Sequence, residues 1–155
     1  MNRAEYSVGF RFAETINIPS TDIKSFASLV GDINPIHHDL SEATRRGHDG
    51  LIACGPHIAS LLAALLTRQF SPLDPMLGLA FNARFTHPYR DGPACFAWTV
   101  KSRRESLKNH GWILRLKGEI LQNELTVMQA MSTVLILGKS VATNAPSSRL
   151  LDISM

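Results

Sequence analysis

GPHIASLLAALL, residues 55–66, is the stretch from which the fold of this chain is best inferred. Gly55-Pro56 predicts a helix start, because the N–H that proline lacks has no helical partner in the first turn. The residues that follow are apolar almost all round, and Phe70-Ser71-Pro72 predicts the end of the helix. A helix without a polar face is expected to be buried. We therefore expect a sheet to surround it.

Strand patterns dominate the sequence after residue 72. Turn-rich segments separate four stretches with alternating or β-branched residues, namely 77–85, 94–106, 112–122 and 125–137. Another strand is expected over residues 8–12, where apolar and polar side chains alternate. One buried helix and an antiparallel sheet of about five strands form an α+β layout. When the sheet wraps around a central helix, this layout is the hot-dog fold, which we predict here.

A second helix and a loop precede the central helix. One apolar face is predicted by residues at i, i+3, i+4 and i+7, which are Ile23, Phe26, Ala27 and Val30. Residues 19–22 supply N-cap candidates, and Gly31 predicts the end of this helix. Residues 32–39 are expected to be irregular, because Pro35 lacks an N–H and disfavours helical backbone before it. A short helical turn is expected at 41–46.

The length and composition indicate one ordinary domain. The chain has 155 residues, of which 45% are hydrophobic and 19% are charged. The sequence contains no internal repeat and no sign of a second domain. We expect the domain to occupy residues 1–138 and a flexible tail to occupy 139–155, where the strand patterns have ended.

The charge pattern argues against a nucleic-acid partner. The formal net charge is +3, and basic residues form short pairs such as Arg45-Arg46 and Arg103-Arg104. Nucleic-acid binding usually needs a clustered basic face. These pairs are interpreted either as solvated surface or as a contact for the phosphates of a pantetheine-type carrier, since arginine matches phosphate geometry.

Cysteine usage and hydropathy favour the cytoplasm. The two cysteines, Cys54 and Cys95, form no C-x-x-C or zinc-ligand pattern, which suits a reducing compartment. The first six residues lack the apolar core of a signal peptide. The most apolar stretch, 58–66, is far shorter than the ~20 residues of a membrane helix. We expect a soluble, cytoplasmic protein without membrane contact.

The segment 31–39, GDINPIHHD, carries the residues of greatest chemical interest. Asp32 and His37 place a carboxylate and an imidazole five residues apart on a loop stiffened by Pro35, and loops on rigid scaffolds often hold catalytic groups. Asp32 and Asn34 are also natural turn formers, because their side chains bond to nearby backbone. From these residues alone, both turn chemistry and acid–base chemistry are open.

A metal site is an alternative for the same segment. Imidazole and carboxylate groups that suit several divalent ions are present at His37, His38, Asp39 and His48. Adjacent histidines seldom point the same way, so we expect no metal.

The segment resembles the signature of the MaoC-like hydratases. The shared pattern is F-A-x-x-x-G-D-x-N-P-x-H-x-D over residues 26–39, and it continues through Ala43 to I-A-C-G at 52–55. A weaker match follows over 81–92. This family includes the (R)-specific enoyl-CoA hydratases and related 3-hydroxyacyl thioester dehydratases. The resemblance implies a hot-dog fold and an activity on acyl thioesters.

The resemblance also implies a role for each site residue. Asp32 and His37 match the catalytic acid–base pair, which holds one water between them. The N–H of Gly55 matches the donor to the thioester carbonyl, and Asn34 matches a residue that braces the loop. The implied reaction is reversible hydration of a trans-2-enoyl thioester to an (R)-3-hydroxyacyl thioester, carried by CoA or by an acyl carrier protein. It requires no metal and no redox cofactor.

Cys54 departs from the family pattern, which usually has histidine before the glycine that opens the helix. The N–H of Gly55 survives this change, whereas the rate and the substrate preference are open. A thiol at a helix N-terminus has a lowered pKa when solvent reaches it, and inert packing is the alternative. We expect Cys54 to border the substrate site and iodoacetamide to label it faster than Cys95.

Two other functions compete with hydration. A thioesterase on the same scaffold would direct water at the carbonyl carbon, since a fold does not fix a function. A non-catalytic acyl-binding subunit is the second rival. A single hot-dog sheet leaves an edge strand unpaired, and such edges are usually covered. We therefore expect a homodimer or an assembly of dimers.

Overall fold

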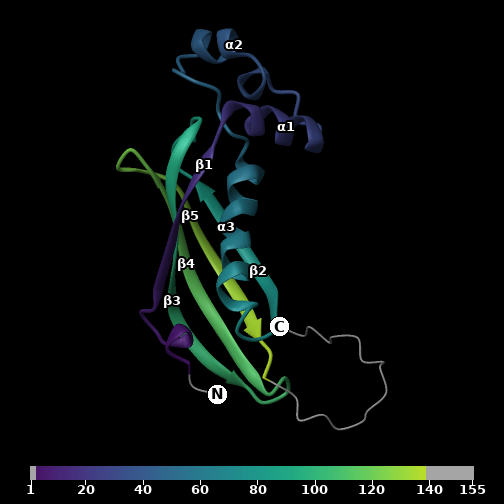
Figure 1. The fold of residues 1–155 in the computed structure, drawn as a ribbon, viewed down its shortest axis with the longest axis vertical. Coiled ribbons are helices and arrows are strands. Elements are labelled where there is room, and N and C mark those ends of the chain that lie inside the picture. The colour runs from purple at the N-terminus through teal and green to yellow at the C-terminus, as the bar shows by residue number, and fades with distance from the viewer. Residues whose placement is uncertain (1–2, 139–155) are drawn as a thin grey trace.

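Helix α3, Gly55–Phe70, begins and ends where the sequence predicts. In the computed structural model, which describes residues 3–138, a curved sheet wraps around this helix (Figure 1). Within these residues the sheet has five antiparallel strands in the order β1-β3-β4-β5-β2. The α+β hot-dog arrangement is therefore confirmed.

Four of the strands lie where the strand patterns predict them. Their bounds differ from the predicted ones by two residues at most: β2 is Met76–Phe85, β3 is Gly92–Ser106, β4 is Gly111–Gln122 and β5 is Leu125–Ile136. The short breaks between them make tight turns. Asn123 and Glu124 both take positive φ between β4 and β5, which places the two strands side by side in antiparallel register.

The first strand is displaced from its predicted position. The alternation over 8–12 predicts a strand, but β1 is Arg11–Ile18. Val8 is exposed in a turn, and Gly9 takes a φ of +91° there. The N–H of Gly9 donates to the carbonyl of Val100. The chain thus turns onto the sheet before the strand begins, so the prediction is wrong for residues 8–10.

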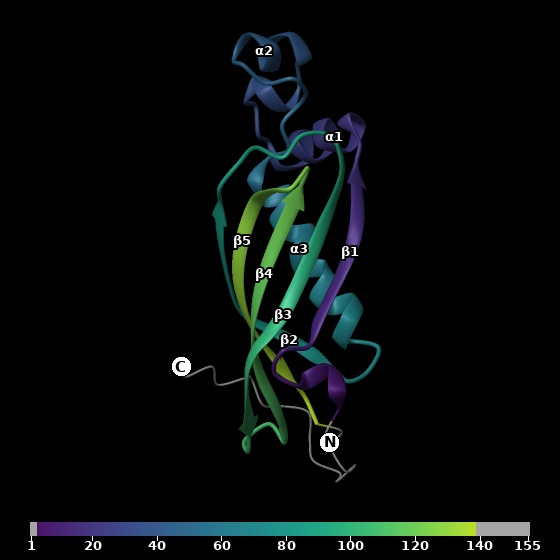
Figure 2. The same ribbon diagram turned by 90° about the vertical axis from the view of Figure 1, so that its left-hand side faces the viewer.

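The remaining helices lie at one end of the sheet, beside the N-terminus of α3 (Figures 1 and 2). They are α1, Ser20–Val30, the short 3₁₀ turn η2, Pro35–His37, and α2, Leu40–Arg45. A further 3₁₀ turn, η1, Ala4–Tyr6, lies near the opposite end. The N-cap of α1 is Pro19, which provides no side-chain hydrogen bond. The polar cap candidates after Pro19 therefore lie inside the first turn.

The core lies between α3 and the inner face of the sheet. Trp98 on β3 is fully buried, and its indole N–H donates to the carbonyl of Leu62 at 2.8 Å. Helix α3 is not buried on every side, because Ser60, Thr67 and Arg68 are exposed. Arg68 instead forms an ion pair with Glu14 on β1 at 2.9 Å. The prediction of a completely buried helix is wrong for this face.

The C-terminal tail and membrane-spanning helices remain to be compared with the sequence-based predictions. The predicted tail at 139–155 lies outside the described residues. Among the helices of residues 3–138, none is sufficiently long and apolar to cross a membrane.

Candidate active site

The loop that carries Asp32 is fixed by the end of α1. Gly31 caps this helix with a left-handed φ of +73°, which residues with a side chain rarely adopt. The next N–H, that of Asp32, then donates to the carbonyl of Ala27 at 2.9 Å. This pair of features is a common way to end a helix, and it leaves the Asp32 side chain at the start of the loop.

Asp32 and His37 are brought together by the turn between them. Asp32 Oδ1 accepts the N–H of Asn34 at 3.1 Å, and the other carboxylate oxygen lies 3.3 Å from His37 Nε2. The Asp32 side chain is 35% exposed, whereas that of His37 is 8% exposed. The turn hydrogen bond expected from the sequence and a contact between Asp32 and His37 are therefore both present, one at each oxygen of the same carboxylate.

The protonation of His37 follows from its other contact. His37 Nδ1 lies 2.6 Å from the carbonyl oxygen of Ile52, which can only accept a hydrogen bond, so Nδ1 must donate. In a neutral imidazole, Nε2 then carries a lone pair and faces the carboxylate of Asp32. Two acceptors 3.3 Å apart repel each other unless a proton or a water lies between them. The geometry therefore has room for a proton or a water between the two side chains.

Asn34 contacts the loop itself. Its side-chain oxygen caps η2 by accepting the N–H of Ile36, and Arg46 reaches the same oxygen, both at 3.5 Å. Further support comes from the backbone, where the N–H of Ile52 donates to the carbonyl of Ile36. This placement fits the bracing role that the resemblance implies for Asn34.

The residues of the alternative metal site are not gathered as ligands. His38 Nε2 is bonded to the backbone carbonyl of Asp32 at 2.5 Å, and Asp39 caps α2 by accepting the N–H groups of Ser41 and Glu42. Within residues 3–138 there is no group of three or more His, Cys, Asp or Glu side chains that could hold a metal ion.

The N-terminus of α3 forms the second half of the site. Cys54 is the N-cap residue and Gly55 the first helical residue. In the described part of the chain, the N–H of Gly55 has no hydrogen-bond partner. Free N–H groups and the helix dipole together favour negative charge at such an end. The loop is tied to the segment that enters this helix, because the N–H of Ile52 donates to the carbonyl of Ile36 and the same Ile52 residue accepts from His37 Nδ1.

Phe85 is a neighbour of this helix end that the sequence did not single out. A Cβ atom at Gly55 would lie 2.8 Å from Cζ of Phe85, so the ring occupies the space that any larger residue would need. The ring is large and apolar, yet Phe85 is 51% exposed. In the sequence, the weak family match over 81–92 was the signal that included Phe85. The contact of its side chain with Gly55 could be seen only once the position of β2 beside α3 was known.

Cys54 does not have the properties expected of a reactive thiol. It is buried, whereas Cys95 is partly exposed. Burial raises the pKa of the Cys54 thiol, and the carboxylate of Asp32 acts in the same direction. These two effects outweigh the N–H of His57, which lowers the pKa. The lowered pKa expected from the helix end is therefore wrong, and inert packing describes Cys54 better.

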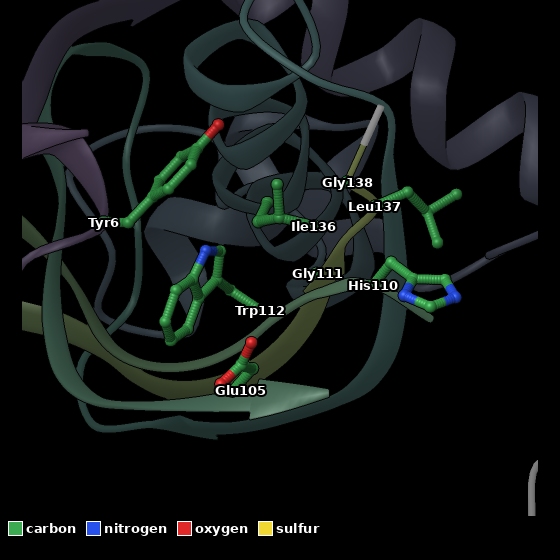
Figure 3. A pocket seen from close by; sticks show the side chains of 8 residues that line it. All are labelled: Tyr6, Glu105, His110, Gly111, Trp112, Ile136, Leu137 and Gly138. Carbon is green, nitrogen blue, oxygen red and sulfur yellow. The ribbon is translucent and has the colours of Figure 1, made fainter. Parts of the chain in front are cut away.

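A cavity of about 80 Å³ lies at the other end of the molecule and includes no residue of the predicted site. Figure 3 shows side chains that line it, among them Tyr6, Trp112 and Ile136. Pockets for organic ligands usually take ~300–1,000 Å³. This cavity is too small for an acyl thioester. A second hollow, of about 400 Å³, is lined by residues of β2, β4 and β5 and also includes no residue of the predicted site. The loop and the α3 N-terminus are the candidate site because they hold the facing Asp32 and His37 side chains and the unpartnered N–H of Gly55.

Solved structures similar to this chain share its fold. An (R)-hydratase from A. caviae involved in PHA biosynthesis is 24% identical, with 86% of this chain and 99% of that one covered and a TM-score of 0.76. An unliganded R-hydratase from Pseudomonas aeruginosa is 24% identical, with 94% of each chain covered and a TM-score of 0.75. A mutant fluoroacetyl-CoA-specific thioesterase, in complex with fluoroacetate and CoA, is 16% identical, with coverages of 84% and 94% and a TM-score of 0.60.

The sequence itself decides the family. No curated protein matches the chain. A family model described as a MaoC like domain matches residues 3–112, which include the loop with Asp32 and His37, helix α3 and the strands β1, β2 and β3. The chain therefore belongs to the MaoC-like domain family.

Proposed function

We propose that this protein hydrates trans-2-enoyl thioesters reversibly to (R)-3-hydroxyacyl thioesters, with Asp32 and His37 as its acid–base pair. The observation that carries the proposal is the facing pair itself, in which Asp32 Oδ2 lies 3.3 Å from His37 Nε2. Asp32 is partly open to solvent, so water can reach it. The similar fold of two (R)-hydratases supports the reaction class.

In the hydration direction, the carboxylate of Asp32 accepts a proton from the bound water as the water oxygen bonds to Cβ of the enoyl group. A weak nucleophile needs such a base within hydrogen-bond reach. The electron pair of the double bond moves toward the thioester, and protonated His37 delivers a proton from Nε2 to Cα. The proton taken by Asp32 then passes back to His37. One water is consumed, and the pair ends in its starting state.

The N–H of Gly55 stabilises the charge that develops in this step. Negative charge accumulates on the thioester oxygen as an enolate forms, and a fixed donor directed at that oxygen lowers the barrier. Pro56 has no N–H, so Gly55 is the first donor that the helix can offer. Its N–H has no partner within residues 3–138, which leaves it free for the substrate.

The carrier of the acyl group is CoA or an acyl carrier protein in this proposal. The proposed reaction needs no redox cofactor, because hydration neither oxidises nor reduces the substrate overall, and no metal, because Asp32, His37 and the N–H of Gly55 supply the base, the acid and the donor to the thioester oxygen. Free Cys54 and Cys95 suit the reducing cytoplasm, which we propose as the location.

One assay separates this function from its rivals. Crotonyl-CoA and longer enoyl-CoAs are supplied, and both the enoyl absorbance and the release of free thiol are followed. Loss of absorbance without thiol supports hydration. Thiol release supports a thioesterase activity. The observation that favours this rival is the fold shared with the fluoroacetyl-CoA-specific thioesterase, at a TM-score of 0.60. Absence of both signals, at a concentration that binds acyl-CoA, supports a non-catalytic subunit.

We also propose that the protein is a homodimer or an assembly of dimers, paired through β2. This strand lies at one edge of the sheet, and the exposed apolar side chains on it and beside it are Leu79, Phe81, Phe85 and Met131. An exposed apolar edge is usually covered in a native protein. Light scattering at micromolar concentration is expected to give at least twice the chain mass, and a monomer would refute this pairing.

A further inference from the structure

His57, in the first turn of α3, is a buried titratable residue that the proposed mechanism does not use. Its ring is stacked on Phe26 of α1, with ring centres 4.4 Å apart and planes inclined by 2°. His57 is 8% exposed, and its buried Nδ1 has no hydrogen-bond partner in the described residues. A leucine or methionine would fill such a position without an unpaired polar atom. The presence of an imidazole therefore calls for a reason.

The stack joins the two elements that hold the candidate site. On α1, Phe26 lies one residue before Ala27, whose carbonyl accepts the N–H of Asp32. On α3, His57 lies two residues after Gly55, the proposed donor to the thioester. A shift of one ring against the other would therefore change the position of Asp32 relative to that donor.

The stack also depends on the charge of the ring. Burial lowers the pKa of His57, and the carboxylate of Asp22 on α1 opposes this change only in part. The positive end of the α3 dipole also disfavours an imidazolium. A cation–π attraction to Phe26 would offset part of the free energy that it costs to charge the buried ring. Cys54, the titratable neighbour on the α3 side, has a raised pKa and stays neutral near pH 7.

We propose that neutral His57, stacked on Phe26, is a positioning residue that fixes Asp32 relative to the Gly55 N–H, and that protonation of the ring in mild acid releases this arrangement. The proposal rests on the proposed function, because it concerns the same site. It goes beyond that function in assigning a role to a residue that touches neither the substrate nor the acid–base pair.

The test that needs no substrate is an NMR titration from pH 8 downward to the midpoint of the His57 ring signals. In the unaltered protein, the amide signals of Asp32 and Gly55 are expected to move with the midpoint of the His57 ring signals. His57→Leu keeps an apolar contact with Phe26 but cannot titrate, so this change of the two amide signals is expected to vanish. Phe26→Leu removes the stack but keeps His57, and it is expected to reduce the movement of the Asp32 and Gly55 amide signals at the His57 midpoint. Amide signals that ignore the His57 midpoint would overturn the proposal.

The test with substrate measures kcat and KM over the same pH range. Between pH 7.5 and 5, kcat of the unaltered enzyme is expected to fall at least about threefold more than kcat of His57→Leu, with similar KM values, because position affects the chemical step more than binding. Identical pH profiles would overturn the proposal. If no enoyl thioester is hydrated at all, the proposed function fails, and the amide titration still decides whether His57 positions the loop.

Discussion

Two carboxylates lie at opposite ends of α3 and are used in opposite ways. Asp32, beside the N-terminus of the helix, faces His37 and keeps 35% of its side chain exposed. Asp74, just beyond the C-terminus, has a side chain with no exposed surface. The hydroxyl of Tyr6 donates to Asp74 Oδ2 at 2.6 Å, and Nε of Arg3 reaches the same oxygen at 3.1 Å.

The difference shows what separates a candidate catalytic carboxylate from a structural one. The C-terminal end of a helix disfavours negative charge. Two donors hold Oδ2 of the buried Asp74 there, whereas Oδ1 has no hydrogen-bond partner among the described residues. Asp32 lies beside the favourable end, and its partner is the imidazole of His37. Within residues 3–138, the carboxylate at the N-terminal end of α3 combines access to water with an imidazole partner, whereas the carboxylate at the C-terminal end has neither.

The largest expected effect is the loss of activity at the open end. Asp32→Asn and His37→Ala are each expected to lower enoyl-CoA hydration by roughly 100-fold or more, because an acid–base group is lost. The midpoint of thermal unfolding should change little in Asp32→Asn, since Asp32 is partly exposed, and should fall more in His37→Ala, since the buried His37 ring bonds to the carbonyl of Ile52. Initial rates at saturating crotonyl-CoA and thermal melts measure the two quantities.

A matched control for His37→Ala is His110→Ala, which removes an imidazole from the β3–β4 turn at the far end of the molecule. It is expected to leave kcat unchanged. Near-normal turnover in Asp32→Asn would remove the carboxylate from the mechanism and would end the contrast between the two ends.

At the C-terminal end of α3, loss of the Asp74 carboxylate is expected to lower stability and not activity. Asp74→Ala leaves the buried hydroxyl of Tyr6 and the side chain of Arg3 without their acceptor. Loss of one partner of a buried pair is expected to lower the free energy of unfolding by about 2–4 kcal/mol, a value reduced because Arg3 is partly exposed. Urea unfolding measures this, and kcat of the folded variant should be unchanged. A stable Asp74→Ala with reduced kcat would reverse the assignment.

Alkaline pH tests the same cluster with a smaller effect. Burial raises the pKa of Tyr6, and the hydrogen bond to Asp74 adds to the rise. The neutral phenol is thus favoured in the folded state, so its contribution to stability is complete below the ordinary value of ~10 and is lost as pH rises above it. Urea midpoints from pH 8 to 11 should fall more steeply for the unaltered protein than for Tyr6→Phe. Parallel curves would show that the phenol does not titrate with unfolding.

The contrast between the two ends also marks what the sequence can predict. The apolar run of α3 and the breaks between the later strands indicated the fold, because hydrophobic periodicity reflects local structure. The Asp32–His37 pair could be predicted from the sequence because both residues lie within one short loop. Asp74 bonds to Tyr6 and Arg3, which precede it in the sequence by 68 and 71 positions, and no local pattern signals such contacts.

Other misses have the same cause. The alternation over 8–12 is a genuine period-2 pattern, yet the turn at Gly9 moves the strand to Arg11–Ile18. The contact of Phe85 with Gly55 depends on how β2 lies beside α3. The stack of His57 on Phe26 likewise depends on how two helices pack. Each of these features is decided by tertiary packing, which overrides local preference.

Gly55→Ala tests the open end with an intermediate effect. The added methyl group would meet the ring of Phe85 at 2.8 Å. The ring and the start of α3 must move apart to make room for the methyl group, so a shift of the Gly55 N–H is expected to lower kcat about tenfold with a small loss of stability. Gly55→Ala with Phe85→Leu should recover part of kcat if the clash is the cause. No recovery, with normal kcat in Phe85→Leu alone, would exclude the clash as the cause.

The smallest expected effect is a difference in labelling between the two cysteines, which compares a sealed side chain with an accessible one. Cys54 is buried at the N-cap of α3, and burial raises the pKa of its thiol, so little thiolate is present near pH 8. Cys95 on β3 is partly exposed. Timed alkylation with iodoacetamide, followed by peptide mapping, is expected to label Cys95 several times faster. Cys95→Ser should then make the native protein react slowly, and denaturation should restore fast labelling of Cys54. Faster labelling of Cys54 in the native state would mean that solvent and thiolate both reach the helix end, and the open end would then contain a reactive thiol beside its acid–base pair.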